Sequence, residues 1–171
     1  SLVPLICGSE GTLVLVTDAT LRILPIPPIN QVCVVSFPSF EDSLRCVSTL
    51  DSFFPDSIHF DSGIIAVEVL DETTFELAKK DRLFDHLSTV LEGLNEVQKS
   101  SLLIISFQAF DRDSLSKLIE AFRLKMGSTL YWLIEDDAVI KDVWSLRKKS
   151  VGLLASLKGV GIPIPFIEDI A

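Results

Sequence analysis

An arginine interrupts the apolar face of the longest helical pattern in this sequence of 171 residues. At about 100° per residue, the apolar side chains of residues 136–157 fall on one stripe, and Arg147 falls inside it. The stripe consists of Ile140, Val143, Trp144, Val151 and Leu154. An inward guanidinium is costly unless an anion meets it. Two interpretations follow: an internal ion pair with an acid such as Glu168 or Asp169, or a two-point clamp on the carboxylate of a bound molecule, for which guanidinium geometry is suited.

A second candidate site is the glycine-containing segment near the start of the chain. It consists of Gly8, Ser9, Glu10, Gly11 and Thr12. Its two glycines allow positive φ angles and a close approach of the backbone to a ligand such as a pyrophosphate, and its two hydroxyls add donors. The same residues are equally typical of a tight turn between two strands. The segment matches neither a Walker loop nor a GxGxxG motif, so chemistry alone leaves both interpretations open.

Other reactive side chains are few and scattered. His59 and His86 are the only imidazoles, and neither has the spacing of a metal-ligand set or of a catalytic triad. The cysteines, Cys7, Cys33 and Cys46, give neither a disulfide framework nor a metal-binding pattern. We therefore predict no metal site and no catalytic residue in this chain. Free thiols indicate a reducing, cytoplasmic compartment.

Composition limits the class of protein. A net charge of −9 argues against nucleic acid as a partner, because phosphate binding needs a basic surface. The hydrophobic content of 48% can fill one core. The sequence has no run of about 18 apolar residues, so no transmembrane segment is predicted. The chain starts without Met and stops inside an apolar extended segment, and we expect it to be a piece of a larger polypeptide.

The elements that would position these residues alternate between strands and helices. Short strands are predicted at residues 13–16 and 20–24, followed by a proline-rich linker at 25–28. Further strands are predicted near residues 31–37, 58–60, 64–70, 101–107 and 128–135, and helices near 39–50, 81–94, 111–126 and 136–157. From residue 31 onward this order favours an α+β fold, in which helices pack on one face of an antiparallel, ferredoxin-like sheet.

Helical periodicity also predicts which side chains face the core. The first predicted helix, capped by Ser39, should point Phe40, Leu44 and Val47 inward. The inward residues expected in the next two helices are Phe84, Leu87, Val90, Leu91 and Leu94, and then Leu115, Leu118, Ile119, Phe122 and Met126. Asp111 or Asp113 should cap the third helix, and Gly127 should end it.

Two blocks near the ends of the sequence resemble one enzyme family. The first is the GSEGTL segment of residues 8–13, and the second is Trp144-Ser145-Leu146-Arg147 together with Glu168-Asp169-Ile170-Ala171. They are similar to FAD-linked oxidases with a flavin domain of the p-cresol methylhydroxylase and vanillyl-alcohol oxidase type (PCMH-type). The branch they resemble contains glycolate oxidase large subunits, D-lactate dehydrogenases and D-2-hydroxyglutarate dehydrogenases. The resemblance covers nearly the whole chain and implies that residues 1–29 are the last strands of the FAD-binding domain. Residues 30–171 would be a substrate-binding cap domain, truncated at its C-terminal end.

The resemblance also implies roles for both candidate sites. The residues that would line the adenosine-diphosphate portion of FAD are Gly8, Ser9, Glu10, Gly11 and Thr12. Arg147 would hold the carboxylate of a 2-hydroxy acid such as glycolate, lactate or 2-hydroxyglutarate. Loss of the hydroxyl proton and transfer of a hydride from the α-carbon to flavin N5 would give the 2-oxo acid. Val151 and Ile167 stand where some relatives have Thr and Lys, so a second carboxylate contact is not implied.

Residues 144–171 are most similar to large family members fused to C-terminal iron–sulfur segments. This implies 4Fe–4S clusters and a catalytic His-containing motif outside these residues, with electrons passing to an acceptor protein or a quinone. It also implies a location in the cytoplasm or at the periphery of the inner membrane. The isolated chain should then be inactive and unable to hold FAD, and its oligomeric state, including a homo-oligomer, stays open. The alternative is a non-catalytic ferredoxin-like module that binds a small carboxylate or mediates assembly.

Overall fold

The computed structural model describes residues 2–54, 62–97, 100–127 and 129–155. Backbone contacts divide the chain into one unit of residues 1–26 with 161–171 and a second unit of residues 27–160. The predicted division into the end of an FAD-binding domain, residues 1–29, and a cap domain, residues 30–171, stays a prediction. Within the described residues, no helix has the length and apolar character needed to cross a membrane.

The described part of the first unit is a short helix followed by a turn and an irregular segment. Helix α1 spans Val3–Ile6 and has a proline in its first turn. The strands predicted at residues 13–16 and 20–24 are wrong, because neither segment forms a strand. A strand needs hydrogen bonds from a neighbouring strand, and no described residue provides them here. The apolar side chains of these segments, such as Leu15 and Ile23, are exposed.

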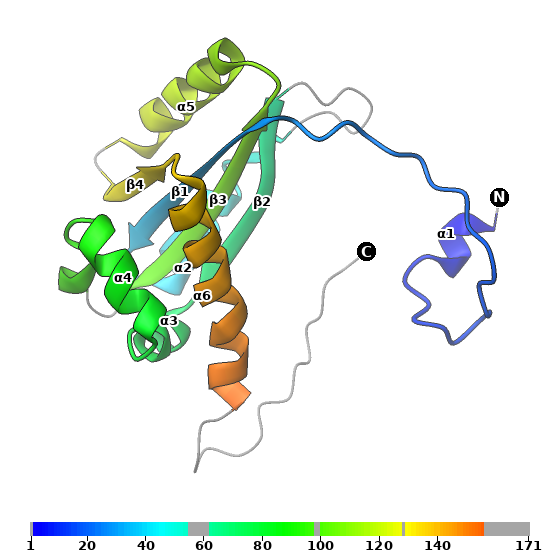
Figure 1. Cartoon of the computed structure of the whole chain (residues 1–171), viewed down its shortest axis with the longest axis horizontal. Coiled ribbons are helices and arrows are strands. Elements are labelled where there is room, and N and C mark those ends of the chain that lie inside the picture. The colour runs from blue at the N-terminus through cyan, green and yellow to red at the C-terminus, as the bar shows by residue number, and fades with distance from the viewer. Residues whose placement is uncertain (1, 55–61, 98–99, 128, 156–171) are drawn as a thin grey trace. The chain divides into compact units, whose positions relative to one another are not determined.

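Four antiparallel strands form the sheet of the second unit (Figure 1). They are β1 (Ile29–Phe37), β2 (Ser62–Leu70), β3 (Ser101–Ala109) and β4 (Tyr131–Ile134), in the order β2-β3-β1-β4. β1 pairs along its length with β3 and pairs with β4 through residues 32–35. The predicted antiparallel α+β fold is therefore confirmed. The strand predicted near residues 58–60 lies outside the described residues.

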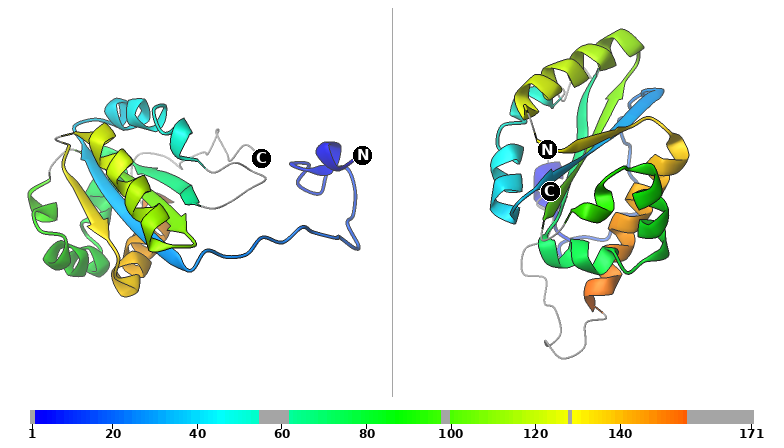
Figure 2. Two further views of the ribbon diagram at one scale, coloured as in Figure 1. Left: turned by 90° about the horizontal axis from the view of Figure 1, so that it is seen from above. Right: turned by 90° about the vertical axis from the view of Figure 1, so that its left-hand side faces the viewer.

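Helices cover both faces of this sheet, whereas the sequence predicts helices on one face (Figure 2). One face, here named the α6 face, is covered by α3 (Glu72–Ala78), α4 (Arg82–Val90) and α6 (Asp137–Ala155). The opposite face, named the α5 face, is covered by α2 (Phe40–Val47) and α5 (Arg112–Met126). Consecutive residues of β1, such as Val34 and Val35, are buried on opposite faces of the sheet. A strand that is apolar on both sides needs cover on both, which the one-sided prediction overlooks.

Local sequence signals fix the ends of several helices as predicted. The Ser39 hydroxyl accepts a hydrogen bond from the Asp42 N–H at 3.2 Å, which caps α2. The Asp111 carboxylate accepts from the Ser114 N–H at 2.8 Å and caps α5. Gly127 ends α5 with a φ of 58°, a conformation that favours glycine.

The segment between β2 and β3 departs from the prediction. Helix α3 is an additional element that periodicity did not reveal, and the Asp71 carboxylate caps it by accepting from the Thr74 N–H at 2.6 Å. The single helix predicted over residues 81–94 is wrong, because α4 ends at Val90. The 3₁₀ helix η2 (Leu94–Glu96) follows after Gly93, whose φ is 81°. A second 3₁₀ helix, η1 (Asp51–Phe53), follows α2.

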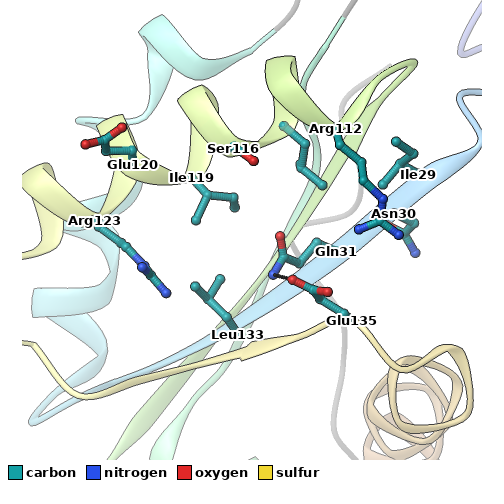
Figure 3. Close-up of a pocket in the computed structure, with 11 residues that line it drawn as sticks. Ile29, Asn30, Gln31, Arg112, Ser116, Ile119, Glu120, Arg123, Leu133 and Glu135 are labelled. Carbon is teal, nitrogen blue, oxygen red and sulfur yellow. Dashed lines mark hydrogen bonds between the residues drawn. The ribbon is translucent and has the colours of Figure 1, made fainter.

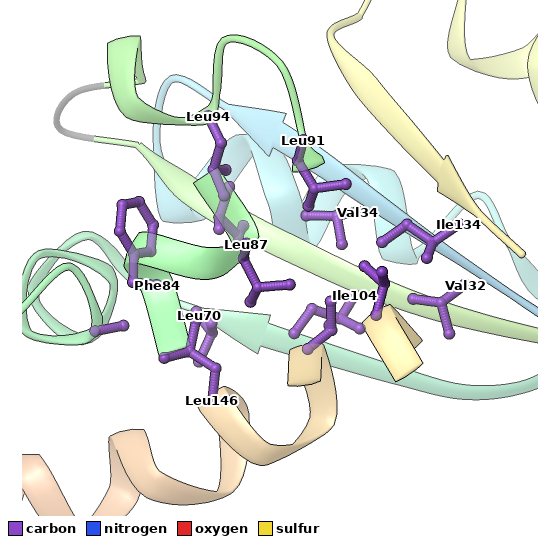
Figure 4. Packing of buried hydrophobic residues seen from close by; sticks show 14 of the residues in the cluster. Val32, Val34, Leu70, Phe84, Leu87, Leu91, Leu94, Ile104, Ile134 and Leu146 are labelled. Atoms are coloured by element: carbon purple, nitrogen blue, oxygen red, sulfur yellow. The ribbon is translucent and has the colours of Figure 1, made fainter. Parts of the chain in front are cut away.

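The core consists of one hydrophobic cluster on each face of the sheet. On the α6 face, Leu87, Leu94 and Ile104 surround a cavity of about 20 Å³ whose lining is entirely apolar (Figure 4). Most predicted inward residues are buried, including Phe84 and Phe122. Val47 and Leu118 are half-buried, and Phe40, Leu44 and Val90 are exposed. In α2 the buried residue is Ser43, so this helix is turned relative to the predicted face.

Candidate functional site

Arg147 lies at the border of the buried face of α6. The buried residues of this helix are Val139, Ile140, Val143, Leu146 and Ser150. This face is rotated relative to the predicted stripe, so Arg147 flanks it and its side chain remains 37% exposed. The rotation is tolerated because the Ser150 hydroxyl donates to the Leu146 carbonyl at 2.8 Å, which satisfies a polar group on the buried face. The side chains of Val151 and Leu154 lie outside what the structure describes.

The guanidinium of Arg147 is paired with Glu68 of β2. Arg147 Nη2 donates to Glu68 Oε2 at 2.6 Å, and the Glu68 side chain is 33% exposed. The acids considered from the sequence, Glu168 and Asp169, lie outside the described residues. Sequence reasoning missed Glu68, although a signal for it exists, because this acid interrupts the apolar run of residues 64–70.

The Arg147 guanidinium has free binding capacity. It carries five N–H donors in a plane, and one of them is used by Glu68. Among the described residues it has no other hydrogen-bond acceptor. Because the side chain is more than one-third exposed, a carboxylate arriving from solvent can reach the remaining donors.

Two side-chain contacts tie α6 to the N-terminal end and the body of α4. Lys149 Nζ lies 3.4 Å from Oδ1 of Asp81, the residue that caps α4. His86 Nδ1 lies 2.9 Å from Asp142 Oδ2. These contacts bridge two helices of the α6 face and so help to fix the helix that carries Arg147.

Residues 8–12 form a largely exposed turn after α1. φ is 75° at Gly8, 47° at Glu10 and 76° at Gly11. The N–H and the hydroxyl of Thr12 both donate to the Ser9 carbonyl, at 2.9 and 2.6 Å, and close the turn. The N–H groups of Gly8, Glu10 and Gly11 meet no acceptor among the described residues. Backbone N–H groups in such turns form concavities that bind anions, so the turn fits a phosphate group, although the Thr12 hydroxyl is already engaged.

The two inner cysteines are unsuited to nucleophilic chemistry. Burial raises the pKa of the Cys33 thiol to about 12, and burial also raises the pKa of Cys46. The Cys46 thiol lies 3.7 Å from the Met126 sulfur. Among the described residues, no three side chains are grouped so that they could hold a metal ion.

A polar cavity of about 500 Å³ lies on the α5 face, between α5 and the strands β1 and β4 (Figure 3). Gln31 Nε2 donates to Glu135 Oε1 at 3.1 Å across its floor, and Arg112 and Arg123 reach it from α5. It is on the opposite side of the sheet from Arg147, whose helix packs on the α6 face. This cavity is therefore separate from the Arg147 site.

Comparison with known proteins gives a consistent picture. The model of the family described as FAD linked oxidases, C-terminal domain, matches residues 26–171. D-2-hydroxyglutarate dehydrogenase of Pantoea ananatis is 27% identical over 176 residues, which cover 98% of this chain and 16% of that protein. The enzyme of the same name from Escherichia coli is 26% identical over 174 residues, which cover 96% of this chain and 16% of that protein. D-lactate dehydrogenase of Archaeoglobus fulgidus is 31% identical over 112 residues, which cover 65% of this chain and 25% of that protein. The chain thus spans 16% of the length of its D-2-hydroxyglutarate dehydrogenase relatives.

Proposed function

The chain belongs to the FAD-linked oxidase family, whose C-terminal domain its residues 26–171 match, and on that premise we propose that it is part of an enzyme that oxidises a D-2-hydroxy acid to the 2-oxo acid. Relatives named D-2-hydroxyglutarate dehydrogenase and D-lactate dehydrogenase support this substrate class. The candidate substrates are 2-hydroxyglutarate, lactate and glycolate. The unit that carries Arg147 would bind the substrate.

The observation that carries the proposal is the partly exposed guanidinium of Arg147 within the W-x-x-R block of α6. Its unused N–H donors can contact both oxygens of a carboxylate, because the guanidinium fork matches that geometry. Its task would be to bind the substrate and orient the α-carbon. The contacts of α6 with α4 through Asp81 and Asp142 support a fixed position for this side chain.

The turn of residues 8–12 is proposed to hold the diphosphate of FAD. The N–H groups of Gly8, Glu10 and Gly11 point to this role, since they lack acceptors among the described residues. The Ser9 hydroxyl would add a donor, and Thr12 would keep the turn closed through its bonds to the Ser9 carbonyl. When bound, FAD supplies the acceptor for the hydride of the substrate.

Further proposals concern the whole protein. They follow from the resemblance to large family members and from the 16% of such relatives that the chain spans. We propose that 4Fe–4S clusters and the groups that move the hydroxyl proton lie in other segments of that protein, and that an acceptor protein or a quinone takes the electrons. We also propose a location in the cytoplasm or at the periphery of the inner membrane. Residues 1–171 alone should then show no turnover.

The test is reduction of the flavin in the full-length protein that contains this chain. The purified protein is mixed without oxygen with D-2-hydroxyglutarate, D-lactate or the achiral glycolate, and with L-2-hydroxyglutarate and L-lactate as controls. We expect the flavin absorbance to bleach with a D-2-hydroxy acid. A protein without flavin absorbance, or a flavin that no hydroxy acid reduces, would contradict the proposal and favour a non-catalytic module.

A substitution of the arginine tests its role in this enzyme. Arg147→Lys should raise KM by about 10- to 100-fold with flavin still bound, because Lys cannot make two parallel contacts with a carboxylate and a charged hydrogen bond contributes about 1.5–3 kcal/mol. Arg45→Lys is a matched control, since Arg45 is also paired with a glutamate, Glu41, but is exposed on α2. Unchanged KM and unchanged stability in Arg147→Lys would rule out the clamp. Loss of folding without a kinetic effect would show that the ion pair of Arg147 with Glu68 has a structural role alone.

A further inference from the structure

We infer that Glu68 is a positioning residue for Arg147 and holds its guanidinium in the orientation that binds a substrate carboxylate. The inference rests on the proposed function. The contact that carries it is the 2.6 Å hydrogen bond from Arg147 Nη2 to Glu68 Oε2. It joins α6 to β2 across 79 residues of sequence, so it connects two elements whose relation the tertiary fold sets.

Glu68 occupies a position on the sheet where an apolar residue would be expected. It pairs with Ile104 of β3, and its neighbour on the same face, Leu70, pairs with Leu102. These three apolar residues are all buried in the cluster of the α6 face. A carboxylate in this row loses part of its hydration, which costs free energy unless a donor compensates it. Arg147 is that donor, and the place of Glu68 on the edge strand β2 leaves the pair open to solvent.

The pair restricts a side chain that would otherwise move freely. An arginine that is 37% exposed has four rotatable bonds and samples many rotamers in solvent. One short bond to Glu68 fixes the direction of its plane and leaves the other donors available. Preorganisation of this kind raises the population of the binding orientation before the substrate arrives.

The charge of Glu68 has the opposite effect on affinity. Arg147 and Glu68 together are neutral, so a guest carboxylate is attracted by the one and repelled by the other. The nearby Lys149 is already paired with Asp81, and Lys148 is exposed. Removal of the Glu68 charge should therefore leave carboxylate affinity unchanged or higher while the orientation becomes less defined. A positioning role of Glu68 therefore predicts a lower kcat without weaker carboxylate binding, which a role in packing alone does not.

The experiment compares Glu68→Gln and Glu68→Leu in the full-length flavoprotein with D-2-hydroxyglutarate and D-lactate as substrates. We expect kcat to fall by about 10-fold in Glu68→Gln and by about 100-fold in Glu68→Leu, because misplacement of a binding group by about 1 Å can cost 100-fold. KM should not rise in Glu68→Gln. Binding of 2-oxoglutarate or pyruvate, followed by the flavin difference spectrum, should be as tight as in the wild type or tighter. Glu41→Gln, which breaks the exposed pair with Arg45, should change none of these values.

The outcomes separate the two proposals. If Arg147→Lys raises KM while both Glu68 variants keep wild-type kcat, the clamp stands and the positioning role is overturned. If Glu68→Gln raises KM at unchanged kcat, the positioning role is likewise overturned. If Arg147→Lys changes nothing, the clamp itself fails and the role of Glu68 falls with it. Should Glu68→Leu fail to fold, Glu68→Gln decides alone, with flavin content and near-UV circular dichroism as checks of its fold.

Discussion

The three thiols of this chain differ in burial and therefore in acidity. Cys7 is exposed, Cys46 is partly buried and Cys33 is buried in the middle of β1. Burial raises the pKa of Cys33 from 9.0 to about 12, and the neighbouring Cys46 adds to this rise. A thiol that stays protonated is a poor nucleophile, so Cys33 acts as a small apolar side chain in the core.

This burial predicts a loss of stability at high pH. The unfolded chain releases the Cys33 proton near pH 9, whereas the folded chain keeps it up to about pH 12. The contribution of the protonated Cys33 thiol to the free energy of unfolding is fully present below pH 9. It falls by about 1.4 kcal/mol per pH unit as the pH rises from 9 to about 12. Urea unfolding at a series of pH values measures the slope. Cys33→Ala should be less stable overall but show a shallower slope, and equal slopes in the two proteins would contradict the prediction.

At the scale of elements, α4 tests how the core of the α6 face is packed. Leu87 is buried beside the apolar cavity of about 20 Å³, whereas Val90 on the same helix is exposed. Leu87→Ala should lower the free energy of unfolding by about 2–5 kcal/mol, because it enlarges an apolar void that water does not fill. Val90→Ala is the matched control and should change the free energy of unfolding by about 0.5 kcal/mol or less. Chemical denaturation of the chain gives both values, and equal losses would show that α4 is rotated relative to this structure.

Helix α2 shows which part of the fold the sequence predicts and which it does not. The cap by Ser39 is predictable, because it depends on residues within one helical turn. The buried face is not, since Ser43 turns inward to contact Ser101 of β3, whose hydroxyl lies 3.2 Å from the Ser43 hydroxyl. Apolar periodicity instead favours Phe40 and Leu44, which are exposed. This polar contact joins residues that are 58 apart in the sequence, so local patterns do not reveal it.

At the Arg147 site, too, local features are predictable from the sequence and long-range contacts are not. The helix that carries Arg147 is predictable from residues 136–157, because helical periodicity is local. The place of Arg147 beside the buried face is not predictable, since the apolar pattern puts it inside that face. Its partner is not predictable either, since Glu68 comes from a strand 79 residues away. The turn of residues 8–12 is predictable because its glycines permit the positive φ angles of 75° and 76°. The strands predicted after it depend on pairing partners, and no such partner occurs among the described residues.

At the scale of the whole molecule, the two units differ in what stabilises them. Among the described residues from 27 to 155, paired strands and two buried clusters protect the backbone. Residues 13–26 form neither helix nor strand, and their large apolar side chains are exposed. Local opening of a backbone requires little free energy where few buried contacts and hydrogen bonds hold it. Residues 13–26 should therefore be much more sensitive to proteases than the helices and strands that follow them.

Limited digestion of residues 1–171 with trypsin tests this difference. Arg22 is the first basic residue of the sequence and lies in the irregular segment, whereas the second, Arg45, lies in helix α2. Cleavage after Arg22 should precede cleavage after Arg45, because a protease binds its substrate as an extended chain and α2 must first unfold. Mass spectrometry of early time points identifies the products, and Arg22→Gln should remove the first of them without changing the rate at Arg45. Cleavage at Arg45 as early as at Arg22 would mean that α2 opens independently of the sheet, and the cap by Ser39 would then be too weak to hold it.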